Sequence, residues 1–418
     1  MLSSYRQIFA APGSLAFSSA GFVARMPISM TGIGIVTMLS QLRGSYGVAG
    51  AVSATLALAA AVAGPRVSRL VDRYGQRRVA LPATAFSLGA VTALLLCARL
   101  GAPDWTLFVC AAAMGAMPST GAMVRARWAH LYRTEAPKLH TAYSYEAVVD
   151  EVCFIVGPIL SIGLATAVFP EAGVLLAAVF LALGVALFTA QRATEPPVHP
   201  LAHRSGGSAI GNAGLQVLVL TFVATGAIFG SVEVVTVAFA QEQGHTAVSS
   251  VVLAVYALGS CLAGVVFGTL RLRGSMAVRF TVGVAAMAVT MVPLVVIGRT
   301  VTGTAGLVAI GGALFVTGIS ISPTLITSMA LVERLVPAAQ LTEGMTWTTT
   351  GLALGVALGS SAAGWVVDAA GAPTGYWVPV GAAAFGALTA LAGLGRLRSG
   401  LPSASTDERA QQTVDLGR

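Results

Sequence analysis

Long apolar stretches alternate with short polar segments along nearly the whole 418-residue chain. Apolar runs of about 18 or more residues with few charges are typical of membrane-spanning helices. The pattern predicts an all-α integral membrane protein with twelve such helices, at about 14–40, 45–67, 79–99, 104–126, 143–169, 172–191, 214–240, 247–270, 279–298, 304–330, 345–367 and 376–395.

One polar segment divides these helices into two groups of six. Residues 192–213 combine proline, glycine, serine and charged residues, a composition typical of a flexible linker. We therefore expect a six-helix bundle at 1–191, a linker at 192–213, a second bundle at 214–398 and a disordered tail at 399–418.

The two predicted bundles share residues at a nearly constant offset. The segment at Pro118 corresponds to the segment at Pro323, a shift of 205 residues, and 139–143 corresponds to 341–345, a shift of 202. Such an offset across separate helices indicates a duplication. Parallel six-helix repeats, related by an axis along the membrane normal, are a transporter architecture.

Composition agrees with a membrane protein, because 56% of the residues are hydrophobic and only 10% are charged. Soluble domains carry roughly 25% charged residues. The net charge of +8 follows from topology: twenty of the 24 Lys and Arg residues lie in loops or tails on the side that holds residue 1. Arg43, Arg99 and Arg299 lie on the other side. This bias predicts a cell-membrane protein with both termini cytoplasmic, and it argues against a nucleic-acid partner.

Motifs for chemistry are missing from the sequence. The four cysteines lie in apolar segments without metal-ligand spacing, so we expect packing roles and no metal site. No nucleophile, cofactor motif or Walker-type phosphate loop is present, which predicts no cofactor, no enzyme activity and no direct use of ATP. A membrane enzyme or a channel is the alternative from another class.

The loop at 69–78 is the most specific motif. It contains Asp72, Arg73, Gly75 and Arg77 in the order Asp-Arg-Tyr-Gly-Gln-Arg-Arg. This order resembles the loop between helices 2 and 3 of the major facilitator superfamily, and the resemblance extends over about residues 10–398. It implies the fold of that family and a cytoplasmic latch between the bundles, made by these four residues. An ordinary positive-inside loop is the alternative.

The second bundle repeats this loop in a less charged form. Gly264 up to Ser275 aligns with the segment that ends at Gly75, and Leu272 stands where the first copy has Asp72. An aspartate at a helix end can bind the N-terminus of another helix or an arginine. The latch that the resemblance implies should therefore be asymmetric and depend on Asp72.

Gly157 and Pro158 in predicted helix 5 resemble the Gly-Pro segment of proton-driven exporters. Proline kinks a helix, and glycine permits close packing, so we expect hinge or packing roles for both, and for Pro118 and Pro323. The resemblance implies a monomeric transporter in the lipid bilayer that exports a small organic compound in exchange for protons. An importer of a polar nutrient is the alternative.

Ionisable residues at membrane depth are energetically costly and therefore candidates for function. Arg25 lies within predicted helix 1, and Glu146, Asp150 and Glu151 lie near the start of predicted helix 5. We expect one cluster, because an isolated charge at this depth is unfavourable. Its excess acid favours a proton or cation relay. The alternative is a structural ion pair, which would include Arg125 or Arg127.

Glu233 is a solitary carboxyl group in apolar predicted helix 7. We favour Glu233 as the main proton-binding site. The alternatives are a contact with a cationic substrate and a protonated carboxyl group that is hydrogen-bonded to a neighbouring helix.

By resemblance, the substrate cavity lies between predicted helices 1, 4, 7 and 10. Flexible apolar side chains at helical spacing suit a lipophilic substrate, although such residues also serve as plain packing. The candidates for its lining are Met26, Met30, Met114, Met117, Phe229, Thr317 and Ser320.

Overall fold

The structure is a computed structural model that describes residues 2–44, 46–198, 207–245, 248–270 and 274–399. All regular elements within these ranges are helices. The predicted tail lies outside the described residues apart from Ser399, as do part of the predicted linker and Leu272.

The first half of the chain forms a helical bundle, and its first element is a short helix. Its elements are α1 (Leu2–Ile8), α2 (Ser14–Arg43), α3 (Tyr46–Tyr74), α4 (Gln76–Arg99), α5 (Asp104–Met114), α6 (Thr120–Leu131), α7 (Ala136–Ala167), α8 (Ala172–Ala190) and η1 (Arg192–Thr194).

The second half forms a similar bundle. Its elements are η3 (Ala209–Gly211), α9 (Ala213–Glu242), α10 (Val248–Phe267), α11 (Met276–Thr300), α12 (Gly303–Leu335), η4 (Ala338–Gln340), α13 (Leu341–Ala370), α14 (Ala372–Gly375), α15 (Trp377–Ala392) and α16 (Leu394–Ser399).

Eleven helical segments of the described chain are long and apolar enough to cross a membrane. The predicted all-α membrane class is thereby confirmed. The predicted span at 104–126 needs a correction, because two helices, α5 and α6, cover it and residues 115–119 separate them. Pro118 lies in this break and donates no backbone N–H. Gly115 packs so tightly on α3 that an added Cβ would lie 2.6 Å from the backbone of Ala59.

The other candidate prolines lie inside continuous helices, Pro158 in α7 and Pro323 in α12. The sequence correspondence between Pro118 and Pro323 is therefore not a correspondence of backbone shape. Close packing of α5 against α3 gives a physical reason for the difference.

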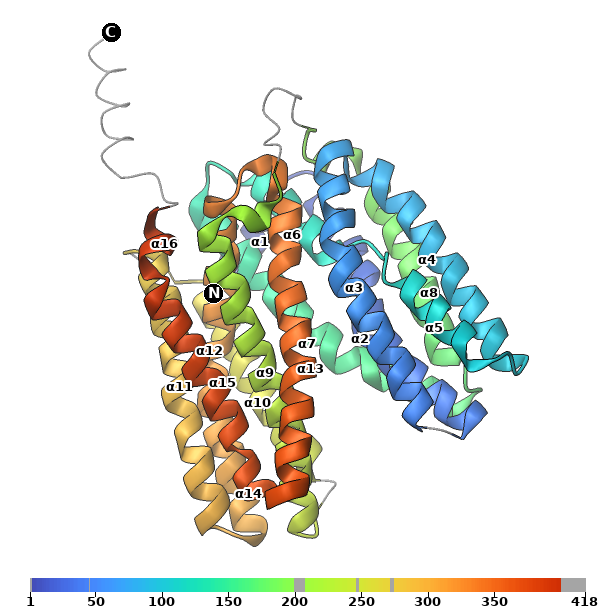
Figure 1. Ribbon diagram of the computed structural model, residues 1–418. Coiled ribbons are helices and arrows are strands. Elements are labelled where there is room, and N and C mark those ends of the chain that lie inside the picture. The colour runs from blue at the N-terminus through green and yellow to red at the C-terminus, as the bar shows by residue number, and fades with distance from the viewer. Residues whose placement is uncertain (1, 45, 199–206, 246–247, 271–273, 400–418) are drawn as a thin grey trace.

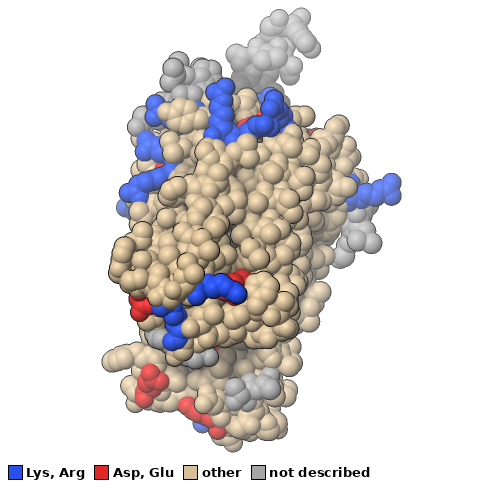
Figure 2. All heavy atoms as spheres, turned by 90° about the vertical axis from the view of Figure 1, so that its right-hand side faces the viewer, with Lys and Arg blue, Asp and Glu red and all other residues tan. Residues whose placement is uncertain are grey.

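Figure 1 shows the two bundles side by side, in contact at the end where α13 starts and diverging towards α14. We call the first of these ends the basic end, defined by the ends of α3, α6 and α16 and the starts of α4, α7 and α13. Figure 2, which faces the first bundle, shows Lys and Arg gathered at this end above a broad band with few charges. Such a band is expected for a surface that contacts lipid tails.

The bundles share buried side chains at the basic end. One apolar cluster there includes Trp128 and Tyr143 from the first bundle together with Leu331 and Leu341 from the second. Other buried clusters lie within one bundle. The basic end is therefore where packing holds the bundles together.

Candidate functional site

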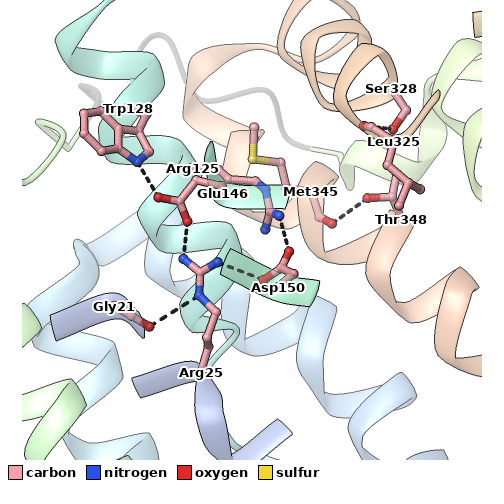
Figure 3. A network of polar contacts seen from close by, with 10 residues as sticks. All are labelled: Gly21, Arg25, Arg125, Trp128, Glu146, Asp150, Leu325, Ser328, Met345 and Thr348. Carbon is pink, nitrogen blue, oxygen red and sulfur yellow. Dashed lines mark hydrogen bonds and ion pairs between the residues drawn. The ribbon is translucent and has the colours of Figure 1, made fainter. Parts of the chain in front are cut away.

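Four charged side chains form one continuous series of ion pairs inside the first bundle (Figure 3). Arg25 of α2 forms ion pairs with Glu146 and Asp150 of α7, the latter with Nη1 and Oδ1 at 2.8 Å. Arg125 of α6 binds the second oxygen of Asp150. Trp128 donates its indole N–H to Glu146 at 2.7 Å. We call Arg25, Arg125, Glu146 and Asp150 the charge quartet.

The composition of the quartet corrects the predicted cluster of three acids and one arginine. Two arginines face two carboxylates, because Glu146 and Asp150 are one turn apart on α7 and point to the same side. Glu146 is fully buried, whereas the side chain of Asp150 is 34% exposed. The quartet therefore has no excess acid and ties α2, α6 and α7 together as the structural alternative proposed.

Arg127, the other candidate partner, lies elsewhere. Its guanidinium donates to Gln76 at 2.7 Å and to Thr194 at 2.9 Å. It also lies over the ring of Phe188, 3.8 Å from the centroid. Arg127 thus joins α4, α6, α8 and η1 rather than the quartet.

Glu151 leaves the predicted cluster and faces the second bundle. Its Oε1 accepts a hydrogen bond of 2.8 Å from the hydroxyl of Ser260 on α10. The hydroxyls of Ser260 and Ser322 of α12 are also 2.8 Å apart. The carboxyl group that sequence reasoning placed with Arg25 therefore joins the two bundles.

Glu233 lies on α9, and its side chain is exposed. One turn earlier on the same helix, the ring of Phe229 packs edge-on against Tyr256 of α10, with centroids 6.3 Å apart. Across the described chain, Glu233 has no hydrogen bond or ion pair. The solitary carboxyl group is thus not neutralised by a neighbouring helix in this conformation.

At the basic end, Asp72 in the last turn of α3 meets the start of α13. Its carboxylate accepts hydrogen bonds from the backbone N–H groups of Thr342 at 3.2 Å and Glu343 at 2.8 Å. The first N–H groups of a helix have no partner within it and carry partial positive charge. A carboxylate is the side-chain group best suited to this position.

Two further contacts between α3 and α13 lie beside Asp72, and sequence reasoning missed them. Ser68 and Thr346 are hydrogen-bonded at 2.8 Å between their hydroxyls. Arg69 lies 3.9 Å from the carboxylate of Glu343, which also accepts a hydrogen bond from Ser208. The only signal for Glu343 was its place in the repeat, which says nothing of a contact between bundles.

The remaining residues of the predicted latch make contacts of other kinds. Gly75 joins α3 to α4 with φ of 95°, a conformation that favours glycine. The backbone N–H of Arg77 donates to Glu195 at 3.0 Å, and the guanidinium of Arg73 lies 5.3 Å from the ring of Tyr74. Of the predicted set, Asp72 is the residue whose side chain binds α13 through hydrogen bonds at the helix start.

A second contact between bundles uses neutral groups at the end of α10. His140 and Thr141 of α7 donate to the carbonyl oxygens of Phe267 and Gly268 at 2.9 and 2.8 Å. Tyr5 of α1 donates to the carbonyl of Val265 at 3.0 Å. Burial raises the pKa of Tyr5 to about 12, so its hydroxyl remains a donor at physiological pH.

A cavity of about 230 Å³ lies between the bundles at the basic end. Asp72, His130, Arg133 and Glu333 contribute to its lining. Glu333 also accepts a hydrogen bond of 3.2 Å from Tyr143. This cavity lies at the level of the contact between α3 and α13, away from the mid-membrane position that the resemblance implies for a substrate.

Most of the residues expected in the substrate cavity are packed inside a bundle. Met26, Met30 and Met114 are at most 3% exposed and belong to the cores of the first bundle. Thr317 is buried and donates to the carbonyl of Thr290 on α11. In this conformation these four residues therefore fill helix interfaces, as the packing alternative proposed.

The other cavity candidates, Met117, Phe229 and Ser320, are half-buried. Of these three, Phe229 packs against the ring of Tyr256 on α10. No group of three or more His, Cys, Asp or Glu residues in the described part of the chain could hold a metal ion.

Comparisons with known proteins place this architecture. No curated protein matches the chain. Among solved structures, a bacterial homologue of the iron transporter ferroportin in an outward-facing state has a TM-score of 0.74 at 16% identity, covering 91% of this chain and 99% of that one. The human organic anion transporter MFSD10 has a TM-score of 0.68 at 14% identity, covering 91% and 100%.

The Escherichia coli fucose:proton symporter has a TM-score of 0.66 at 14% identity, covering 90% of this chain and 97% of that one. At such identities these likenesses show the shared fold alone. Residues 17–315 match the family model of the Major Facilitator Superfamily. The chain therefore belongs to the major facilitator superfamily and is a secondary transporter rather than an enzyme.

Proposed function

We propose that this protein is a proton-driven exporter of a small organic compound that works by alternating access. The observation that carries the proton coupling is the carboxyl group of Glu233. It lies on a membrane helix with no cationic partner in the described chain. A carboxylate without a counter-ion in a membrane protein gains from binding a proton, so Glu233 is our coupling site.

The charge quartet is a poorer candidate for the proton-binding site than Glu233. Arg25 and Arg125 compensate Glu146 and Asp150 in charge and hydrogen bonds. Removing one partner of a buried, paired group is strongly unfavourable. The quartet therefore acts as a rigid base for α7 in our proposal, and the proton is carried elsewhere.

Contacts at the basic end supply the conformational part of the mechanism. Asp72, bound to the start of α13, holds this end closed while the opposite end diverges. Such contacts exist in one state and break in the other when bundles rock. If the basic end is cytoplasmic, as the positive-inside bias predicts, the structure corresponds to an outward-facing state.

The direct test measures proton movement in proteoliposomes that hold a pH-sensitive dye. Glu233→Gln removes the titrating group at nearly constant size, so substrate-dependent proton flux should be lost while membrane insertion is retained. Glu135→Gln is the matched control, because Glu135 is an exposed acid paired with Lys138 at the basic end. Full proton-coupled transport by Glu233→Gln contradicts the assignment.

Direction is tested by imposing the proton gradient each way. An exporter driven by exchange moves its substrate against an inward proton flux. Movement of substrate and protons in the same direction would instead indicate a symporter, which is the alternative that imports a polar nutrient.

A further inference from the structure

Glu151 marks the level at which the two bundles separate. Along α7 from the basic end, His140 is hydrogen-bonded to the last residue of α10, and Glu151 is then hydrogen-bonded to Ser260 of the same helix. Beyond Glu151, no residue of α7 hydrogen-bonds to the second bundle within the described chain. Phe154 and Ile155 lie about one turn after Glu151 on α7, and they are 56% and 50% exposed.

The carboxylate of Glu151 has only part of its bonding capacity used. Oε1 accepts the Ser260 hydroxyl, which in turn contacts Ser322. No Arg, Lys or His of the described chain forms an ion pair with Glu151. A negative group with a free oxygen thus faces the second bundle beside two hydroxyl groups.

Tyr256 supplies an independent sign of a ligand at this place. It lies one turn from Ser260 on α10, and its side chain is only 9% exposed. Its hydroxyl has no hydrogen-bond partner, although it lies within electrostatic range of Glu151. Leaving a buried hydroxyl unpaired costs about 1–3 kcal/mol, so such groups call for an explanation.

The chemistry of these groups selects one class of ligand. A carboxylate attracts a cation, and hydroxyl oxygens accept N–H groups. The rings of Tyr256 and Phe229, packed edge to face, offer an apolar and π-rich wall. A transition-metal ion is disfavoured, because the donors are one carboxylate and hydroxyls, which such ions bind less well than nitrogen or sulfur.

We propose that Glu151, Ser260, Ser322 and Tyr256 form the substrate site, and that it takes an organic ammonium compound with N–H donors and an apolar or aromatic body. This inference rests on the transporter function proposed above and adds the class of its substrate. The ammonium group binds Glu151 and the Tyr256 hydroxyl, and the body of the molecule packs along Phe229. A ligand that enters from the end where the bundles diverge would contact both bundles at once.

The test measures binding to the purified protein in detergent by isothermal titration calorimetry, with three probes of one shape. These are 4-phenylbutylammonium, its N,N,N-trimethyl analogue and 4-phenylbutanoate. The primary ammonium should bind best, and the trimethyl analogue at least about fivefold more weakly, because it donates no hydrogen bonds. The carboxylate should not bind detectably.

Two variants test whether Glu151 and Tyr256 cause the preference for the primary ammonium. Glu151→Gln should weaken ammonium binding by about 10- to 100-fold, the effect of a hydrogen bond to a charged group. Tyr256→Phe keeps the ring and should weaken the primary ammonium by about fivefold while leaving the trimethyl analogue unchanged. Glu135→Gln, which removes an exposed acid at the basic end, is the control, and it should bind the ammonium normally. Unchanged thermal unfolding verifies that each variant is folded.

These experiments distinguish an incorrect ammonium site from an incorrect proton site, because different results contradict each. Absence of ammonium binding at millimolar concentration, equal binding of ammonium and carboxylate, or normal binding by folded Glu151→Gln overturns the ammonium site. Proton-coupled transport by Glu233→Gln would overturn the coupling proposal alone. Loss of ammonium binding in Glu151→Gln with retention in Glu135→Gln supports the ammonium site.

Discussion

At the scale of single residues, charge distinguishes two of the contacts that close the basic end. Between α3 and α13, the carboxylate of Asp72 binds two backbone N–H groups at a helix start. Between α7 and α10, the neutral side chains of His140 and Thr141 bind backbone carbonyls. Because charged acceptors form the stronger hydrogen bonds, the first contact should contribute more to the closed state.

Replacing Asp72 by Asn tests this difference. Asn keeps an acceptor but loses the negative charge at the start of α13, which is worth about 1–2 kcal/mol in a partly buried geometry. The population with an open basic end should rise about 5- to 30-fold, and transport should fall. Accessibility of a single cysteine introduced at the start of α13 measures the population.

The comparison variant is Leu272→Ala, at the corresponding position of the repeat, which lies outside the described residues. Its effect on transport should be smaller than that of Asp72→Asn. Equal loss in both variants would reduce the loop at 69–78 to a topology signal.

At the scale of helices, glycine sets how closely α7 approaches α2. A Cβ added to Gly157 would lie 2.0 Å from the hydroxyl oxygen of Ser29 and 2.9 Å from its Cβ. Ser29 also donates to the carbonyl of Cys153 at 2.8 Å. This close packing keeps Arg25 within reach of the carboxylates on α7.

A pair of glycine variants on the same helix measures this packing. Gly157→Ala should lower stability by about 1–3 kcal/mol, the usual effect of overpacking. Gly163→Ala should be neutral or slightly stabilising, because an added Cβ there meets nothing within 4 Å. Thermal unfolding in detergent reports both. Equal unfolding temperatures for the two variants would show that α2 and α7 adjust to the added methyl group without loss of stability.

At the scale of the whole molecule, the two bundles touch at one end and diverge at the other (Figure 1). Alternating access requires this contact to break in each transport cycle. Ser68 and Thr346, whose hydroxyls are 2.8 Å apart, belong to different bundles. They therefore offer a place to lock the basic end.

The pair Ser68→Cys and Thr346→Cys, in a background without the four native cysteines, should form a disulfide under mild oxidation. The cross-link would hold the basic end closed, so transport should stop and should return on reduction. The two single-cysteine variants are the controls. A fully cross-linked protein that transports at the normal rate would show that the contact between α3 and α13 need not open.

The candidate site was only partly predictable from the sequence. Asp72 was expected to meet a helix start or an arginine, but no pattern named α13 as its partner. Glu151 and Asp150 are neighbours in sequence, yet they face different bundles. Met26 and Met30 fit the spacing of a cavity wall and are instead packed in a core, because helical spacing gives a face and not its neighbour.

The sequence by itself determined the membrane class, most of the spans and the family. These features depend on local hydrophobicity and on a motif, both of which are properties of contiguous residues. Only the tertiary structure decided the break at Pro118, the balance of the charge quartet and the place of Glu151 beside Ser260 and Tyr256. Each of these depends on which helices pack together, and packing brings together residues far apart in sequence.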